Sequence, residues 1–212
     1  MTNFQFDLHT HSFYSGDCKN NPKDMIKQAI KVGLSGIAVT DHNTTKFHHQ
    51  NYDDNKLVIL FGVEVSTKSG HIIGLGIKDM ITKGMSIEET IENINELNGL
   101  AIAPHPFDFT RKGIGRKIYN LKEITVETLN GSSPIDYFNE KARKWAIKNN
   151  LPVTGGSDAH RIKDIGMAYT VFENEVTNID EAIDQIRRKK TTAAGTHLTL
   201  GEKFIRTFQI HF

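Results

Sequence analysis

The chain has 212 residues, enough for one domain with a core of its own, and one domain is expected. A formal net charge of +1 excludes a global field that attracts nucleic acids or anionic membranes, so any nucleic-acid partner must be held locally. The single cysteine excludes an internal disulfide, and the lack of a signal-peptide pattern and of any run of about 20 apolar residues predicts a cytoplasmic protein outside the membrane.

The first 75 residues alternate between strand and helix patterns. The apolar spacing that follows Pro22 predicts a helix that ends at Gly33, and a helix between two short strands is a βαβ unit. The turn-like composition of residues 67–70 favours a hairpin between the strands on either side of it. In chain order, strands are expected at residues 4–8, 37–40, 56–65 and 71–75.

The second part of the chain continues the same rhythm with one interruption. Ser86 and Glu89 have the spacing of a capping box, and further helices are expected after Pro134 and after Asn178. Residues 107–120, rich in Lys, Arg, Gly and aromatic residues, are interpreted as a long functional loop. Strands are expected at residues 100–103, 124–129, 151–154, 169–172 and 191–194, the last of them parallel, while residues 202–212 fit either a helix or a closing strand.

No composition shift, proline-rich linker or repeat divides this series of strands and helices, which predicts a single α/β domain over residues 1–212 with a largely parallel sheet. About seven strand candidates favour a closed, barrel-like arrangement, and an open doubly wound sheet is the alternative. In either architecture the functional site lies at the carboxyl ends of the strands.

The stretch Asp7–Ser12, DLHTHS, places two imidazoles at the end of the first strand. His9 and His11 are two residues apart in an extended segment, so they point to the same side and can bind one ion. A divalent ion needs about four ligands, so the rest of the chain must supply more. The alternative is that both histidines are ordinary polar residues at a strand end.

Further imidazoles and carboxylates follow the later strands. A single histidine or aspartate after a strand is more often a turn residue than a ligand, but their joint placement at successive strand ends predicts a multinuclear metal site. The candidate ligands are His9, His11, Asp17, His42, Glu64, His71, His105, Asp158 and His160, with Asp41 beside them. We assign His48 and His49 to solvent and His211 to a structural or exposed position, and leave His197 undecided.

In chain order, the motifs DLHTHS, TDHN, GVE, GHIIGLG, HP and GSDAH resemble those of the PHP family, named for polymerase and histidinol phosphatase. The resemblance runs from Asp7 to His160 and implies a distorted (β/α)7 barrel that holds two or three divalent ions, zinc, manganese or iron. The first loop reads SGDC, residues 15–18, where many members read SDG. The chain also lacks the long insertion of some family phosphoesterases.

The resemblance further implies how the ligands divide among the ions. His9, His11, Glu64 and Asp158 would bind one ion, and Glu64 would bridge it to a second. His71 and His105 would complete the second site. The third ion would be held by Asp17, His42 and His160.

Such a site predicts hydrolysis of phosphoesters, most simply of a small phosphomonoester, by a metal-bridging hydroxide. Glu64, Asp158 and His160 are the candidate catalytic residues, and Asp7 and Asp41 are expected to orient imidazoles, with direct contact between Asp41 and a metal as the alternative. Glu127 and Asn130 either line the pocket or form a turn. A further set of cations either neutralises the substrate or forms a solvated basic loop: Arg161, Arg111, Lys112, Arg116 and Lys117.

Two alternatives to this function remain open. An exonuclease or an oligonucleotide or nucleotide phosphodiesterase would use the same metals, and the RKGIGRK loop, residues 111–117, with Phe107, Phe109 and Tyr119 is the local basic and aromatic cluster that suggests it. A non-catalytic metal-binding regulatory module is the second alternative. The expected partner is therefore a phosphorylated small molecule or, in the nuclease case, a nucleotide or oligonucleotide, and the oligomeric state stays open.

Overall fold

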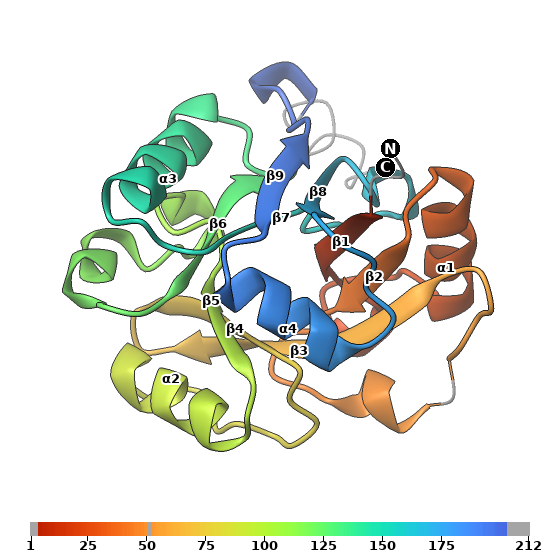
Figure 1. The fold of residues 1–212 in the computed structure, drawn as a ribbon, viewed down its shortest axis with the longest axis horizontal. Helices are drawn as coiled ribbons and strands as arrows, with labels where there is room; N and C mark the ends of the chain where they lie inside the picture. Colours follow the sequence, from red (N-terminus) through yellow and green to blue (C-terminus); the bar gives the residue numbers. More distant parts are fainter. Residues whose placement is uncertain (1–3, 51, 203–212) are drawn as a thin grey trace.

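The computed structural model describes residues 4–50 and 52–202, and in these residues the strands form one nine-stranded sheet that curls into a nearly closed barrel (Figure 1). The strand order is β7-β6-β5-β4-β3-β2-β1-β8-β9. The α/β barrel class predicted from the sequence is confirmed. The strands are β1 (Phe4–Thr10), β2 (Gly36–Val39), β3 (Val58–Thr67), β4 (Gly70–Leu75), β5 (Leu100–Ala103), β6 (Thr125–Asn130), β7 (Val153–Gly156), β8 (Ala168–Phe172) and β9 (Thr191–Gly195).

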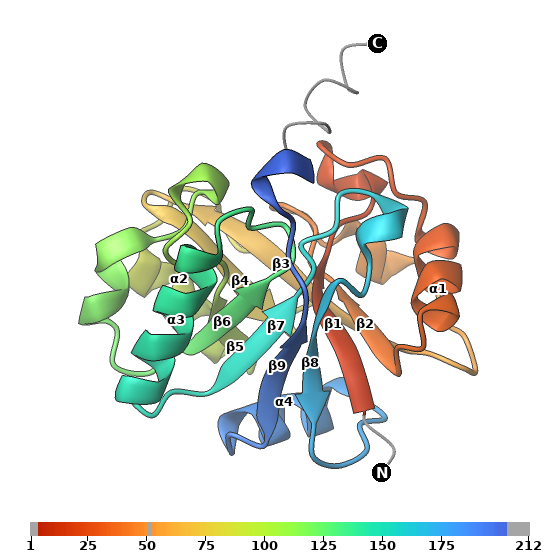
Figure 2. The ribbon, with the colours of Figure 1, turned by 90° about the horizontal axis from the view of Figure 1, so that it is seen from above.

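Three helices cover the outside of the barrel, α1 on one side and α2 and α3 on the other (Figure 2). The helices are α1 (Pro22–Lys31), α2 (Ile87–Glu96), α3 (Asp136–Lys148) and α4 (Ile179–Arg187). The Ser86–Glu89 capping box and the Asn178 cap are both present, as predicted. The segment predicted as a long loop contains two short 3-10 helices, η3 (Phe109–Arg111) and η4 (Gly115–Asn120). The further 3-10 helices are η1 (Phe13–Ser15), η2 (Lys46–His49) and η5 (Ile162–Asp164).

The barrel closes between β7 and β1. The Asp158 N–H just after β7 donates a hydrogen bond to the His9 carbonyl (2.7 Å), and the His11 N–H donates to the Ala159 carbonyl (3.2 Å). This closure places the residues after β7 directly beside the DLHTHS stretch. Residues that are far apart in the sequence thereby meet at one end of the barrel.

The interior of the barrel is divided into an apolar half and a polar half. Phe6 and Leu8 of β1, Leu60 of β3 and Ile73 of β4 pack in one buried cluster. The α4 side chains Ala182, Ile183 and Ile186 belong to the same cluster, so this helix covers the end of the barrel opposite the polar half. The apolar half therefore holds the strands together, which leaves the other half available for a site.

The last strands run differently from the prediction. β9 was expected to be parallel, but it pairs antiparallel with β8, which in turn pairs antiparallel with β1. The reason is that α4 covers the end of the barrel instead of lying on the outer face of the sheet, so the chain returns in the opposite direction. The hairpin between β3 and β4 is confirmed. Of the predicted tail, residues 203–212, including His211, lie outside the described residues.

We expect Ile94→Ala to lower the free energy of unfolding by about 2–5 kcal/mol, because Ile94 is fully buried in α2 and the substitution leaves a cavity. The matched control is Ile147→Ala in α3, where the side chain is 71% exposed and the expected change stays within about 0.5 kcal/mol. Equilibrium urea unfolding measures both. Equal losses in the two variants would contradict this assignment of the core.

Candidate metal centre

Two irregularities in strand register direct polar side chains into the barrel. In β1 the register advances from Asp7 to Thr10 while its partner β2 advances only from Ile37 to Val39, so β1 contains an extra residue. Such a bulge turns the following side chains to the other face. Leu8 therefore lies in the apolar cluster inside the barrel, and His9 and His11, after the shift, also reach the interior.

β6 contains a second irregularity of the same kind. Glu127 pairs with Thr154 and Leu129 with Gly155, so β6 advances two residues where β7 advances one. Glu127 and Asn130 consequently face each other, and the Asn130 Nδ2 donates to Glu127 Oε2 at 2.9 Å. Both bulges lie at the polar end of the barrel.

Glu64 of β3 is the centre of the polar half. Its carboxylate is 1% exposed and is surrounded by five imidazoles. The oxygen Oε1 faces His71 (2.8 Å) and His105 (3.2 Å), whereas Oε2 faces His42 (3.1 Å), His9 (3.4 Å) and His11 (3.4 Å). The two oxygens thus serve two different groups of imidazoles, as a bridging carboxylate would.

Asp158 is the second buried carboxylate. Its Oδ1 lies 3.3 Å from His11 Nε2 and 3.5 Å from His160 Nδ1, and its Oδ2 contacts the Arg111 guanidinium and lies 3.8 Å from His105 Nε2. Asp158 adopts a left-handed conformation with φ 53°, unusual for a residue other than glycine and sparsely populated because of its strain. The fold therefore holds this side chain in an unfavourable backbone conformation at the site.

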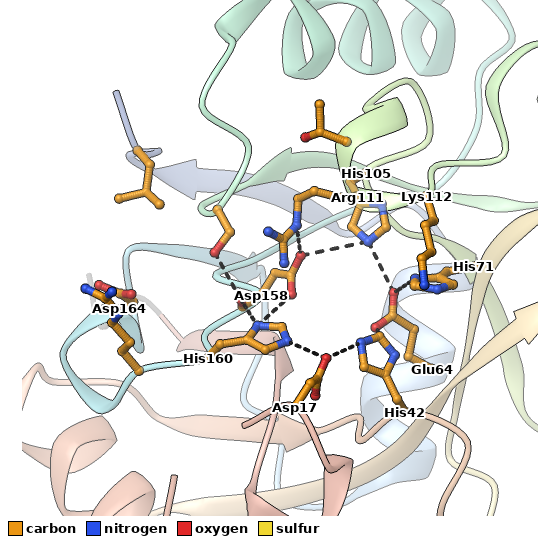
Figure 3. A pocket seen from close by; sticks show the side chains of 14 residues that line it. Asp17, His42, Glu64, His71, His105, Arg111, Lys112, Asp158, His160 and Asp164 are labelled. Atoms are coloured by element: carbon orange, nitrogen blue, oxygen red, sulfur yellow. Dashed lines mark hydrogen bonds and ion pairs between the residues drawn. The ribbon is translucent and has the colours of Figure 1, made fainter. Parts of the chain in front are cut away.

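Asp17, in the loop after η1, completes the cluster at the mouth of the pocket. Its Oδ2 lies 3.3 Å from His42 Nε2 and 3.4 Å from His160 Nε2, and its side chain is half exposed. Every residue that the sequence suggested as a metal ligand is therefore brought to one place. Figure 3 shows those that line the pocket: Asp17, His42, Glu64, His71, His105, Asp158 and His160. Four trios have ligand atoms that all lie within 4.8 Å of one another: His11–His42–His160, His9–His105–Asp158, His9–His11–Glu64 and His42–Glu64–His71.

The donor atoms fit metal ions better than they fit one another. The Nε2 atoms of His9 and His11 are 3.2 Å apart, and they form a hydrogen bond only if one nitrogen carries a proton. Among the described residues, the buried His71 Nε2 and His105 Nδ1 have no hydrogen-bond partner. His42 Nδ1 is close to Glu64 but outside hydrogen-bond geometry. Imidazole nitrogens combined with carboxylate oxygens suit zinc, manganese and iron.

The charges of the cluster are tightly coupled. Burial raises the pKa of Glu64 and Asp158, but His9 and its neighbours, together with Arg111 at Asp158, bring both pKa values well below the usual range. Burial lowers the pKa of His9, but Asp158, Glu127 and Glu64 outweigh it and raise that pKa well above 6.5. Burial lowers the pKa of His11 to about 3. The carboxylates are thus ionised, and a proton on His9 partly compensates them.

At the mouth of the pocket, two histidines also hold protons more tightly than usual. For both His42 and His160, burial lowers the pKa, but the hydrogen bond to Asp17 and the nearby carboxylates outweigh it and raise the pKa above 6.5. The pKa of Asp17 is lowered by the same two imidazoles. These positions therefore carry protons that a cation would have to displace.

Glu127 is the functional residue that sequence reasoning identified least clearly. Its Oε1 lies 3.0 Å from His9 Nδ1, and its Oε2 accepts hydrogen bonds from the His105 N–H (2.7 Å) and from Asn130 Nδ2. The same Asn130 amide nitrogen donates to Asp158 Oδ2 (3.2 Å). The signal available in the sequence was a charged residue inside the strand expected at residues 124–129, and the structure shows this glutamate to be buried. Glu127 thus orients one candidate ligand and fixes the backbone of another.

Asp7 and Asp41 do not orient imidazoles as expected. The Asp7 carboxylate accepts hydrogen bonds from the backbone N–H groups of Ser157 (2.8 Å) and Gly166 (2.9 Å), and burial raises its pKa to about 6. Asp41 accepts two hydrogen bonds from Ser12, both at 2.6 Å. Both aspartates therefore fix the loops that carry the ligands, because the nearest donors are backbone amides and a hydroxyl.

The ligands open into a pocket of about 390 Å³. Of the predicted substrate-binding cations, Arg111, Lys112 and Arg161 line this pocket, together with Ser132 and Leu198. Arg116 and Lys117 do not line it and lie exposed on η4. The structure thus brings only part of the basic segment to the site.

The other histidines that the structure describes, His48, His49 and His197, and Cys18 lie outside the ligand cluster. His48 was assigned to solvent, but it is half-buried, and its Nε2 lies 3.0 Å from the Gly62 carbonyl because η2 packs against β3. His49 is exposed, as expected. His197 Nε2 lies 3.3 Å from Asp136. Burial raises the pKa of the Cys18 thiol to about 11, which disfavours a nucleophilic thiolate.

Comparison with known sequences reveals clear relatives. A family model described as PHP-associated matches residues 136–191. An uncharacterised protein of Methanocaldococcus jannaschii is 41% identical over 158 residues, which is 67% of this chain and 91% of that protein. This relative is similar over nearly its whole length.

Two solved structures share the fold. A two-domain protein from Bacteroides vulgatus that contains a PHP-like metal-dependent phosphoesterase aligns with a TM-score of 0.69 and 19% identity, over 92% of this chain and 65% of that one. The lesion-specific endonuclease EndoQ from Pyrococcus furiosus aligns with a TM-score of 0.67 and 18% identity, over 92% of this chain and 59% of that one. This chain thus spans less than two thirds of either protein.

In the described residues, no helix has the length and apolarity needed to cross a bilayer. The barrel topology, the convergence of imidazoles and carboxylates at one end of it, and the sequence relatives agree with one another. This chain belongs to the PHP family.

Proposed function

We propose that this protein hydrolyses phosphoesters, in the simplest case a phosphomonoester, with two or three divalent ions bound at the polar end of the barrel. The observation that carries the proposal is the arrangement of Glu64, whose two oxygens face two separate groups of imidazoles at the base of a pocket lined by cations. A buried carboxylate that only stabilises the fold does not need five imidazoles around it.

The proposed ligands divide into three neighbouring sets, and the first two of them share Glu64. When bound, divalent ions lower the pKa of coordinated water and neutralise charge on phosphoryl oxygens. The first set is His9, His11, Glu64 and Asp158, the second adds His71 and His105 to Glu64, and the third is Asp17, His42 and His160. Glu64, Asp158 and His160 are the proposed catalytic residues because each touches members of more than one set.

The cations of the pocket wall are proposed to bind the substrate, whereas the imidazoles and carboxylates bind the metal ions. Arg111, Lys112 and Arg161 line the pocket beside the ligands, and we propose that they bind the phosphoryl oxygens of the substrate. Arg111 contacts Asp158 and also lines the pocket, so it connects the ligand cluster with the space above it. An ion pair of this kind holds the guanidinium in a fixed place, and its planar fork of donors can bind two oxygens of a phosphoryl group.

The nuclease and the non-catalytic module are the competing functions. The same ligands and cations would serve a phosphodiester, and one structural neighbour is a lesion-specific endonuclease. A binding module would hold the metals without turnover. Substrate panels and metal stoichiometry distinguish these possibilities.

The first test is activity after reconstitution with manganese, zinc or iron, on a panel of phosphomonoesters and short 5′-phosphorylated oligonucleotides. We expect phosphomonoester turnover that falls more than about 100-fold in His9→Ala and in Asp158→Ala, since ligand loss costs at least as much as loss of a group that orients a ligand. Ile147→Ala is the control with normal turnover. Turnover of oligonucleotides alone would identify a nuclease, and stoichiometric metal without turnover would identify a binding module.

We expect Glu127→Gln to weaken metal affinity by about 10–100-fold. In wild type the Glu127 carboxylate holds a proton on His9 Nδ1, so that Nε2 is the nitrogen available to the metal, and the variant lacks this charge. Competition with a chromophoric chelator measures the affinity without reference to activity. Glu123→Gln is the matched control because Glu123 is exposed. Equal affinities of Glu127→Gln and wild type would show that His9 does not depend on this carboxylate.

Metal affinity is expected to rise with pH. The folded protein holds protons on His9, His42 and His160 with raised pKa values, and a metal must displace them, so protonation competes with binding at low pH. Below the pKa of such a histidine, metal affinity rises about tenfold per pH unit for each proton that the metal displaces. The gap in Tm between manganese-loaded and metal-free protein should therefore widen from pH 6 to pH 8. A constant gap would contradict proton displacement.

A further inference from the structure

Beside the pocket lies an aromatic patch that the proposed chemistry does not use. We call Phe109, Tyr137 and Phe138 the aromatic ridge. Phe109 is 77% exposed and Tyr137 is 64% exposed. The Phe109 ring packs edge-on against Phe138 with centroids 5.7 Å apart, and Tyr137 lies 6.0 Å from the same ring. The three rings therefore form a connected and largely solvent-exposed surface.

The ridge is fixed at the rim of the pocket. Phe109 begins η3, and the next residues of this short helix, Thr110 and Arg111, line the pocket. Asp108 caps η3 by accepting hydrogen bonds from the Thr110 N–H (2.9 Å) and hydroxyl (2.7 Å). Its other oxygen accepts from the Ser133 hydroxyl (2.6 Å), which ties η3 to the segment that leads into α3. The distance between ridge and pocket is thus built into the fold.

Positive charge accompanies the rings. Lys112 lines the pocket and is exposed, and Lys141 of α3 lies 4.5 Å from the Phe107 ring centroid and 5.9 Å from that of Tyr137. Of the nearby acidic side chains, Glu140 pairs with Arg143 and Lys144, and the exposed Asp136 lies 3.3 Å from His197 Nε2, which opposes its charge only when the imidazole is protonated. Lys112 and Lys141 therefore supply cations beside the ridge for the phosphates of a polyanion.

We infer that the aromatic ridge binds the bases of a single-stranded nucleic acid whose terminal phosphate enters the pocket, an inference that rests on the proposed phosphoesterase function. Exposed aromatic rings beside cations bind single-stranded nucleic acids, because the bases stack on the rings and the negatively charged phosphates of the backbone lie against the cations. Balanced net charge requires such local binding. Two exposed rings outside the pocket provide room for more than a single nucleotide.

The test measures binding without turnover. A fluorescently labelled 5′-phosphorylated hexathymidylate and a strand of equal length with abasic sugars are titrated into wild type in EDTA, with fluorescence anisotropy as the readout. We expect wild type to prefer the base-bearing strand and Phe109→Ala to reduce that preference about tenfold, the effect of one stacked base. Phe109→Trp should retain the preference. Ile147→Ala, an exposed apolar residue at the far end of α3, is the control and should also retain it.

Three results would overturn the inference. Equal binding of both strands by wild type, or equal weakening of both by Phe109→Ala, would mean that the ring contacts no base. Competition by thymidine monophosphate as strong as that by hexathymidylate would assign the ridge to a free nucleotide. Binding is measured in EDTA and therefore does not depend on metal-dependent turnover. A protein without turnover would contradict the proposed function, and the binding result could still be interpreted.

Discussion

The structure depends on the buried carboxylate of Glu64 and the imidazoles around it. A carboxylate that is 1% exposed costs several kcal/mol of desolvation unless opposite charge and hydrogen bonds compensate it. The compensating groups come from β1, β4 and the segments after β2 and β5. The strands β1, β2 and β5 must therefore end, and the antiparallel β4 must begin, at one edge of the sheet. The barrel is the architecture that brings these strand ends together.

Strand ends could be predicted from the sequence, but the direction of their side chains could not. The alternation of residues correctly placed His9 and His11 on one side of β1. Strict alternation also places Leu8 on the opposite side, whereas the bulge between Asp7 and Thr10 allows Leu8 and His9 both to reach the interior. A bulge is fixed by the pairing of β1 with β2, and that pairing is a tertiary interaction which one segment of sequence does not encode.

The residues that orient the ligands could not be predicted from the sequence either. Asp7 and Asp41 were chosen because they neighbour ligands in the sequence, yet they bind backbone amides and Ser12. The carboxylate beside His9 is Glu127, 118 residues away in the chain. Ligand types are recognisable from the motifs that contain them, whereas the groups that orient ligands are determined by which strands become neighbours.

The two halves of the barrel have opposite energetic roles. The polar half gathers three carboxylates and six imidazoles, and their repulsion and desolvation are only partly offset by the protons on His9, His42 and His160. The apolar half, filled by residues such as Phe6 and Ile73 and covered by α4, supplies stability that does not depend on a bound ion. A scaffold stabilised in this way can keep the ligands close together before a cation arrives, so metal binding need not drive folding.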